Sequence, residues 1–499
     1  MPEVMACVQH LYREAGEDLA AGLILTPYVD FCVADATRPQ EAIKLIETSG
    51  DKFVDLLTPS LIAGSRIDTE YYLKEAIRLS IHQDATIKER AIFSLGRLEY
   101  PFKEGDLPEK ALTKLEHAIE KENEDVLIAV IIASAFGLYE KQKSLDDRVT
   151  MLIDTALIKG GDSALYAASR MLRFKNYEIP ELLLDKLLHH LRRVNPAHRR
   201  TLNNIDYRLQ ELLAGENPEK AIRFIEELLT ANTGTLSIET FDNVSWELLR
   251  NKDGLLNRIM TKWFLGGERA LCKVILDILI HQDISHDLPL AADPKELYGI
   301  DSNRIFFLAK KAIGYLFFRP VTAASIILSL IQYTEEKETK KALTELLFDP
   351  LLINYPGKVE NYLKEQINSE IDAIKIACEE AIATFEQYKH ELQSTGDIPE
   401  LYPYQSHRED YHRHHFRQML EVTKRAEEKS ILGGLVSKAV ILYGRSSIVY
   451  VYKSKGKTER VETPFHHHEF SFEIPRLSVI TPFEFEYMLH VFQAEKIQA

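Results

Sequence analysis

Four histidines near residue 410 have side chains that could do chemistry. They lie in the segment HREDYHRHHFR, at His407, His412, His414 and His415. On a helix, His407, Asp410 and His414 share one face, because steps of three and four residues bring side chains together. Imidazole and carboxylate groups on one face could bind a transition metal, or act as acid and base near neutral pH.

The alternative interpretation of these histidines is a solvated helix of mixed charge. Arginines and acids are interleaved with them, as at Arg408, Glu409 and Arg413. A metal site would also need further ligands, and residues 466–468, three consecutive histidines, could supply them only if the two segments meet in space. In a strand those three would alternate between faces and would not converge. A metal-dependent hydrolase is therefore one hypothesis, and no cofactor is predicted.

A basic segment, residues 186–208, is the second candidate. Within a chain of formal net charge −15 it reverses the local charge. On the exposed face of a helical array it could bind a phosphate backbone or an acidic protein segment. The residues proposed for this role are Lys186, Arg192, Arg193, His198, Arg199, Arg200 and Arg208.

Two other interpretations of the basic segment remain open. Arg193 and His198 have the Arg-x4-His spacing of one family of helical ribonucleases, but Pro196 between them would break the helix that such a site needs. The cations could instead pair with neighbouring acids, for which the candidates are Glu216, Glu219, Glu226 and Glu227.

No catalytic signature accompanies these clusters. The chain has no GxxxxGK[ST] phosphate loop, no GxSxG serine elbow and no HExxH zinc motif. Its paired glycines, such as Gly160 and Gly161, stand alone at helix junctions. We therefore expect that the protein is not an enzyme.

The elements that must position these residues are helices. Up to about residue 388, apolar residues recur at three and four residue spacing between short polar connectors. The clearest segment, residues 84–98, places Ile87, Ala91 and Leu95 on one face, with Asp84 as its cap. Gly96 would permit close packing near its end.

The same pattern recurs at a fixed interval. Similar segments begin at Asp84, Asn123 and Asp162, so each begins 39 residues after the previous one. The order Asp84, Ile87-Lys88, Ala91 and Leu95-Gly96 resembles the second helix of a HEAT repeat, and looser matches begin at Gly266 and Glu370. The resemblance covers about residues 50–390 and implies an α-solenoid of stacked helix pairs. Residues 233–254 interrupt it, as an inserted loop or as a junction between two arms.

The character of the sequence changes after residue 395. Residues 396–429 are predicted to be a linker and a charged helix that begins near residue 407. Residues 430–499 are predicted to form a small α+β domain, which resembles no family that we recognise. Its expected strands are 438–443, 447–453, 458–463 and one from His468, and its last helix runs from Thr481 to about Lys496. That helix would lay Phe485, Met488, Leu489 and Phe492 on the sheet.

The strand at 447–453, SIVYVYK, bears on self-association. If it is an edge strand, its backbone could pair with a second copy or with a partner. The alternative is an ordinary central strand. The predicted fold class is thus mainly α, with a HEAT-like solenoid over residues 1–395 followed by the small α+β domain.

The composition limits which cellular locations and which kinds of partner are expected. The 499 residues hold four cysteines without a CxxC pair, which favours buried free thiols in the cytoplasm. Residues 1–17 lack the features of a signal peptide, and no apolar run reaches the length of a membrane helix. An acidic total also argues against wholesale coating of nucleic acid or anionic membrane.

These observations favour binding over catalysis. The first hypothesis is a scaffold or adaptor subunit that binds a partner protein through the solenoid surface, with the C-terminal domain as a second contact or a homo-oligomer interface. The alternatives are a nucleic-acid-binding or processing subunit that uses residues 186–208, and a metal-dependent hydrolase that uses the helix 407–415.

Overall fold

The protein folds mainly into α-helices, as the sequence predicts. The computed structural model describes residues 1–16, 21–49, 52–101, 106–173, 179–215, 217–281, 287–396, 398, 404–429, 446–453, 457–464 and 473–497. The chain divides into two compact units, residues 1–316 with 491–499, and residues 317–490.

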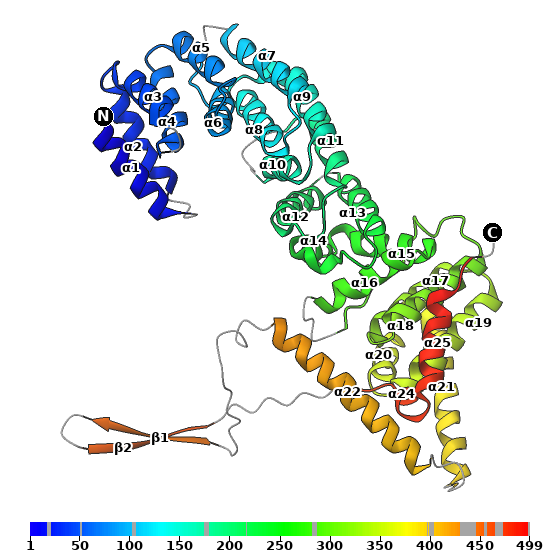
Figure 1. The fold of residues 1–499 in the computed structure, drawn as a ribbon. Helices are drawn as coiled ribbons and strands as arrows, with labels where there is room; N and C mark the ends of the chain where they lie inside the picture. Colours follow the sequence, from blue (N-terminus) through cyan, green and yellow to red (C-terminus); the bar gives the residue numbers. More distant parts are fainter. Residues whose placement is uncertain are drawn as a thin grey trace. The chain divides into compact units, whose positions relative to one another are not determined.

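The first unit is a series of helices joined by short connectors (Figure 1). Their bounds are α1 Pro2–Ala15, α2 Ala21–Val33, α3 Arg38–Ser49, α4 Leu57–Ser65, α5 Thr69–Leu79, α6 Ala85–Leu95, α7 Asp106–Lys121, α8 Asp125–Lys141, α9 Asp146–Lys159, α10 Asp162–Leu172, α11 Glu181–Leu191, α12 Arg199–Ala214, α13 Glu219–Ala231, α14 Asp242–Leu249, α15 Leu255–Gly266, α16 Arg269–His281 and α17 Ser302–Leu316.

These helices pack in two rows from α5 to α14. Helices α6, α8, α10, α12 and α14 contact one another in sequence and form the even row. Helices α5, α7, α9, α11 and α13 form the odd row, which is linked by packing up to α11 and by ion pairs from α11 to α13. Each helix from α5 to α13 also packs on a neighbour in the other row. This arrangement is compatible with a helical repeat solenoid.

The close packing predicted at Gly96 occurs. Asp84 caps α6, since its carboxylate accepts from the backbone N–H groups of Thr86 and Ile87. At the other end of α6, a Cβ on Gly96 would overlap the carbonyl oxygen of Ser134 in α8. A Cβ on Gly137 would in turn lie 2.6 Å from the carbonyl oxygen of Gly96. The two helices can therefore approach only because both positions lack a side chain.

An aspartate cap also links successive helices of the even row. Asp125 of α8 accepts from the backbone N–H groups of Gly161, Ser163 and Ala164 at 2.6, 2.7 and 3.2 Å, and so caps α10. Asp206 of α12 does the same for α14, with Val244 N at 3.0 Å. A carboxylate is favoured there because the first N–H groups of a helix have no partner within it.

Lysine and arginine side chains donate to carbonyl oxygens at the other ends of the helices. Lys141 of α8 donates to Arg97 O, after the end of α6, at 2.8 Å. Lys159 of α9 donates to Ile119 O of α7 at 2.7 Å, and Arg193 to Leu157 O of α9 at 2.6 Å. Each positive charge thus meets the carbonyl end of an earlier helix in its own row, where the helix dipole favours it.

Residues 233–254, expected as an inserted loop or a junction, instead contribute a helix to the even row. After the short 3₁₀ helix Ile238–Thr240, α14 buries Val244 and Leu248. The sequence pattern did not reveal α14, because this helix is only eight residues long and has no side-chain cap of its own. The cap comes from Asp206, 37 residues earlier.

The first unit ends at α17, where residues 491–497 pack. Lys311 is 1% exposed and donates to the carbonyl oxygens of Gln493 and Glu495 at 2.6 and 2.7 Å. Burial lowers the pKa of Lys311, because the ammonium loses its hydration. Gln493 Nε2 also donates to Gly314 O at 2.6 Å. This segment is therefore held by hydrogen bonds to the helical stack.

The second unit is built on four helices and a π-helical turn, together with the returning end of the chain. The bounds are α18 Pro320–Tyr333, α19 Lys337–Leu346, a π turn at Leu347–Leu352, α20 Lys358–Gln366 and α21 Asp372–Thr395. Helix α18 is buried along nearly its whole length and contacts the other three. Gly396 follows α21 with a φ of 68°, at the start of the predicted linker.

The charged helix and a hairpin follow in this unit. Helix α22, Gln405–Lys429, confirms the helix predicted from residue 407. Strands β1, Ser446–Lys453, and β2, Lys457–Pro464, pair antiparallel with Ser446 opposite Pro464. The predicted strand at 438–443 and the strand from His468, apart from its last residues Glu473 and Ile474, lie outside the described residues.

The predicted C-terminal α+β domain is not supported. The last helices, α24 Arg476–Ile480 and α25 Pro482–Ala494, occur near the predicted position. However, Phe485 packs against Phe317 and Phe318, with ring centroids 5.2 and 6.1 Å apart, and not on a sheet. Glu473 caps α20 through Gly357 N at 2.6 Å, and Asn354 accepts from Leu477 N. The end of the chain therefore packs on the helical core of this unit.

Candidate interaction surface

Part of the predicted basic segment takes part in ion pairs that hold the odd row together. Lys186 Nζ lies 2.9 Å from Asp154 Oδ2, and His190 Nε2 lies 2.7 Å from the other oxygen of the same carboxylate. Burial alone would raise the pKa of Asp154, but the hydrogen bonds from Lys186 and His190 outweigh it and lower that pKa. Lys186 therefore bridges α11 to α9.

The two arginines after α11 are also engaged. Arg192 Nε lies 2.6 Å from Glu227 Oε2 of α13, one of the acids considered as its partner from the sequence. Arg193 donates to the backbone of α9, as described above. Arg193 and His198, the pair of the Arg-x4-His interpretation, both lie in the connector between α11 and α12. They therefore do not form the helical site that this interpretation needs.

The rest of the segment lies at or within α12. His198 Nδ1 is 3.5 Å from Asp162, and Arg208 pairs with Glu211 at 3.0 Å. Arg199 and Arg200 are exposed in the first turn of α12. The predicted residues thus do not converge on one site, because α11 and α12 belong to different rows.

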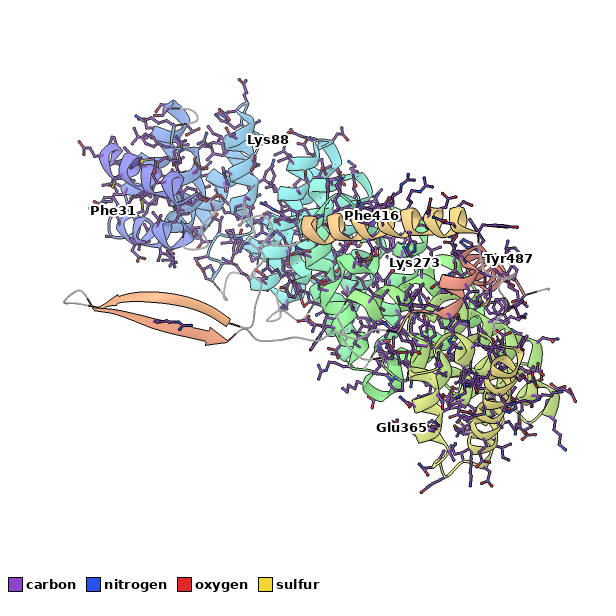
Figure 2. All side chains as sticks on the ribbon, turned by 90° about the horizontal axis from the view of Figure 1, so that it is seen from below. Phe31, Lys88, Lys273, Glu365, Phe416 and Tyr487 are labelled. Carbon is purple, nitrogen blue, oxygen red and sulfur yellow. The ribbon has the colours of Figure 1, made fainter. Side chains whose placement is uncertain are left out.

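The same kind of pairing runs along the rest of the odd row. Arg148 of α9 pairs with Glu116 of α7 at 2.7 Å, and Lys220 of α13 pairs with Glu181 of α11 at 2.7 Å. Lys88, which is labelled in Figure 2, belongs to α6 of the even row and pairs with Glu122, just after α7, at 2.6 Å. The partners lie 32 to 39 residues apart in sequence, close to the repeat interval. Charges of the odd row therefore serve the stacking of repeats.

The even row presents a different surface. Helices α10 and α12 pack on the helix before and the helix after them in the row, and also on the odd row, so only one stripe of each reaches solvent. In α10 the exposed residues recur as Asp162, Tyr166, Arg170 and, just beyond, Arg173. The exposed stripes of α10, α12 and α14 lie on the side of the unit that faces away from the odd row. We call this side the even face.

Aromatic residues stand out on the even face. Tyr166 is 36% exposed, Tyr207 of α12 is 44% exposed and Trp246 of α14 is 55% exposed. The guanidinium carbon of Arg173 lies 5.8 Å from the centre of the Tyr207 ring. Trp246 lies two residues after Val244. The backbone N–H of Val244 donates to Asp206, which is the residue next to Tyr207. Arg173, Tyr207 and Trp246 therefore lie on three consecutive helices of one face.

Sequence analysis missed this surface. None of Tyr166, Tyr207 and Trp246 was considered there as a binding residue. The available signal was positional, since each aromatic residue occupies a solvent-facing place in a helix whose other faces are apolar. An aromatic side chain in that place keeps a large part of its surface in contact with solvent.

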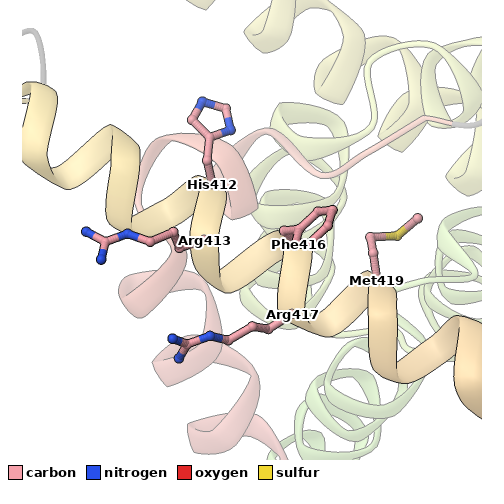
Figure 3. A pocket seen from close by; sticks show the side chains of 5 residues that line it. All are labelled: His412, Arg413, Phe416, Arg417 and Met419. Atoms are coloured by element: carbon pink, nitrogen blue, oxygen red, sulfur yellow. The ribbon is translucent and has the colours of Figure 1, made fainter.

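The histidine helix also carries exposed apolar residues. Figure 3 shows His412, Arg413, Phe416, Arg417 and Met419 along α22, around an open space of about 530 Å³. Phe416 is 64% exposed and Leu420 is 54% exposed. All the lining residues belong to a single helix, which cannot enclose a small ligand. Arg413 pairs with Asp410 at 2.6 Å.

A metal centre receives no support from these residues. Among the side chains that the structure describes, no group of three His, Cys, Asp or Glu could hold a metal ion. Asp410 and His414 are exposed on α22, whereas the side chain of His407 and residues 466–468 lie outside the described part. The hydrolase hypothesis is left without a described ligand set.

Comparison with known proteins adds no assignment. No protein-family model, curated protein or solved structure matches the chain. Within the described residues, no helix is long and apolar enough to cross a membrane. A functional assignment therefore depends on the surfaces themselves.

Proposed function

We propose that the chain is a noncatalytic scaffold or adaptor subunit that binds a partner protein through the even face. The observation that carries this proposal is the exposure of Tyr207 and Trp246 beside Arg173 on neighbouring helices. Trp, Tyr and Arg are the residue types that contribute most binding energy at protein interfaces. Exposed aromatic residues near one another mark interaction sites more often than they mark stable monomeric surfaces.

We also propose that the stack is a HEAT-like solenoid. Support comes from the paired helices and from cross-repeat contacts at similar intervals, such as Asp125 with Gly161 and Asp206 with Asn243. A solenoid offers a long surface without a pocket, which suits binding of a protein segment. Three of the four cysteines are buried free thiols, and burial raises the pKa of Cys272 and Cys378 to about 12. Such unreactive thiols fit the cytoplasmic location that we propose.

Capture experiments with matched variants test this proposal. The tagged full chain is purified from the cells that naturally produce it, and proteins bound in stoichiometric amount are identified by mass spectrometry. Trp246→Ala combined with Tyr207→Ala should remove such a protein. Ile158→Ala in α9, which removes a 66% exposed apolar side chain of the odd row, should keep it. Loss with both variants, or with neither, would contradict binding through the even face.

A self-association role for the C-terminal segment is the second part of the proposal. The exposed Phe416 and Leu420 of α22 support it, together with β1, which pairs only with β2 among the described strands. We expect dimers whose mass falls to that of the monomer in Phe416→Ser with Leu420→Ser. Light scattering after gel filtration measures this, and a monomeric wild-type chain would reject self-association.

A further inference from the structure

We propose that the even face recognises an acidic segment of its partner through a cluster of Arg170, Arg173, Tyr207, Trp246 and Arg250, which we call the Arg-Trp cluster. This inference rests on the proposed function and names the chemistry of the partner. It follows from where the cluster directs its charges.

The cluster is assembled by contacts between three helices. Asn204 of α12 donates to Ser169 Oγ of α10 at 3.1 Å, which places the end of α10 beside the middle of α12. Arg170 and Arg173 lie at that end, and Arg173 lies over the Tyr207 ring. Asp206 joins α12 to the start of α14 through Val244 N. Trp246 and Arg250 follow on the exposed stripe of α14.

The nearby acids leave positive charge facing solvent. Glu247 is 4% exposed and lies 3.3 Å from Arg250, whose side chain remains 61% exposed. Glu211 is paired with Arg208. Asp162 lies at the opposite end of α10 from Arg170 and Arg173, whereas Asp242, the exposed acid of α14, lies one turn before Trp246 and near Asp206. The exposed charges at the cluster itself are thus the guanidinium groups of Arg170, Arg173 and Arg250 and the carboxylate of Asp242, so positive charge is in excess.

This combination suits carboxylates on a flexible chain. A guanidinium group presents a planar fork that binds a carboxylate through two hydrogen bonds. Tyr207 and Trp246 between the arginines would receive an apolar or aromatic side chain of the same segment. A nucleic acid is disfavoured, because a chain of net charge −15 repels a continuous polyphosphate and three arginines neutralise few phosphates.

Fluorescence anisotropy with a defined probe tests the inference. The probe is a labelled random copolymer of Glu and Tyr in a four-to-one ratio, and the comparison polymers are a Lys and Tyr copolymer and a 20-nucleotide oligo(dT). The wild-type chain should bind the acidic copolymer saturably, and more weakly as salt rises. Arg173→Gln with Arg250→Gln should weaken this binding by at least about tenfold.

The matched control combines Arg223→Gln in α13 with Lys110→Gln in α7, which also removes two positive charges, at exposed positions of the odd row. It should leave binding of the acidic copolymer unchanged. An equal loss in this control, no binding of the acidic copolymer, or tighter binding of oligo(dT) would each overturn the inference. If the Arg173 and Arg250 variant still captures the natural partner while the Trp246 and Tyr207 variant does not, the proposed function holds and acidic recognition is wrong.

Discussion

The two rows of the first unit expose different kinds of residue. In the odd row, charged side chains meet each other across successive helices, as Arg148 meets Glu116 and Lys220 meets Glu181. On the even face, Tyr207 and Trp246 reach solvent beside arginines that point outward. Stacking of the helices explains the charges of the odd row, but it does not explain the aromatic residues of the even face. Five substitutions probe this contrast through stability, from the largest expected effect to the smallest.

Gly96→Leu should have the largest effect, because it acts inside the even row. The new side chain would collide with the backbone of α8 at Ser134 and force the two helices apart. We expect a loss of about 3 kcal/mol in the free energy of unfolding, measured by urea denaturation. Gly22→Ala in α2, where no atom lies within 4 Å of the added Cβ, should be neutral or stabilising. Equal losses in both variants would contradict the close approach of α6 and α8.

Asp125→Asn should cost about 1–2 kcal/mol at pH 7, because it removes a charged cap from α10. Burial alone would raise the pKa of Asp125, but the N–H donors of Ser163, Gly161 and Ala164 outweigh it and lower that pKa. A lowered pKa stabilises the folded state above the unfolded value of about 3.9, and this stability is lost as pH falls through the folded value. The cost of the substitution should therefore shrink in acid, as followed by urea midpoints across pH.

Asp206→Asn provides the opposite pH dependence. Burial raises the pKa of Asp206 despite its hydrogen bonds from Val244 and Asn243. A raised pKa stabilises the folded state below the unfolded value, and that contribution is lost as pH rises through the folded value. The advantage of wild type over this variant should therefore decrease as pH rises. Parallel pH profiles for the two variants would show that the two caps do not differ as described.

Arg148→Gln should have a small effect. It breaks the ion pair with Glu116, whose two side chains are 40% and 34% exposed. Pairs of this exposure contribute about 0.2–1 kcal/mol, and salt weakens them. The urea midpoint should fall slightly in low salt and approach the wild-type value in high salt. A large loss that salt does not reduce would mean that the odd row depends on these charges far more than proposed.

Trp246→Ala should have the smallest effect on stability. Its side chain is 55% exposed, so the folded state should change by no more than about 0.5 kcal/mol. Thermal unfolding measures this directly. If the variant loses several kcal/mol, Trp246 is needed for packing of α14, and its exposure no longer argues for a binding role.

Local patterns in the sequence predicted the helices well. Asp84, the apolar stripe of α6 and Gly96 lie within twelve residues or so of one another, and cap, core face and close approach follow from them. The charged helix α22 was equally clear. Such features are predictable because helix periodicity and capping depend on residues close in sequence.

Contacts between distant residues were not predictable in the same way. Phe485 was expected on a sheet, but it packs on Phe317 and Phe318, more than 160 residues earlier. Both surfaces could bury its ring, and nothing local in the sequence selects between them. Helix α14 was missed for a related reason, since its cap is supplied by Asp206 of another helix.

The candidate surface depended on the same long-range information. The cluster of positive charge at residues 186–208 was visible in the sequence, and Glu227 was among the acids considered as its partners, but Asp154 was not. The aromatic residues of the even face are spaced about 40 residues apart. Only the packing of α10, α12 and α14 shows that they share one side.

Site-specific photocrosslinking tests the central claim most directly. A benzophenone amino acid is placed at Asn203, on the exposed stripe of α12 next to Tyr207, or at Thr155, an exposed position of α9 in the odd row. After irradiation of intact cells, adducts are identified by mass spectrometry. The account predicts one protein adduct from position 203, competed by the acidic copolymer in lysate, and none from position 155. An adduct from position 155 alone, or the same adduct from both, would contradict it.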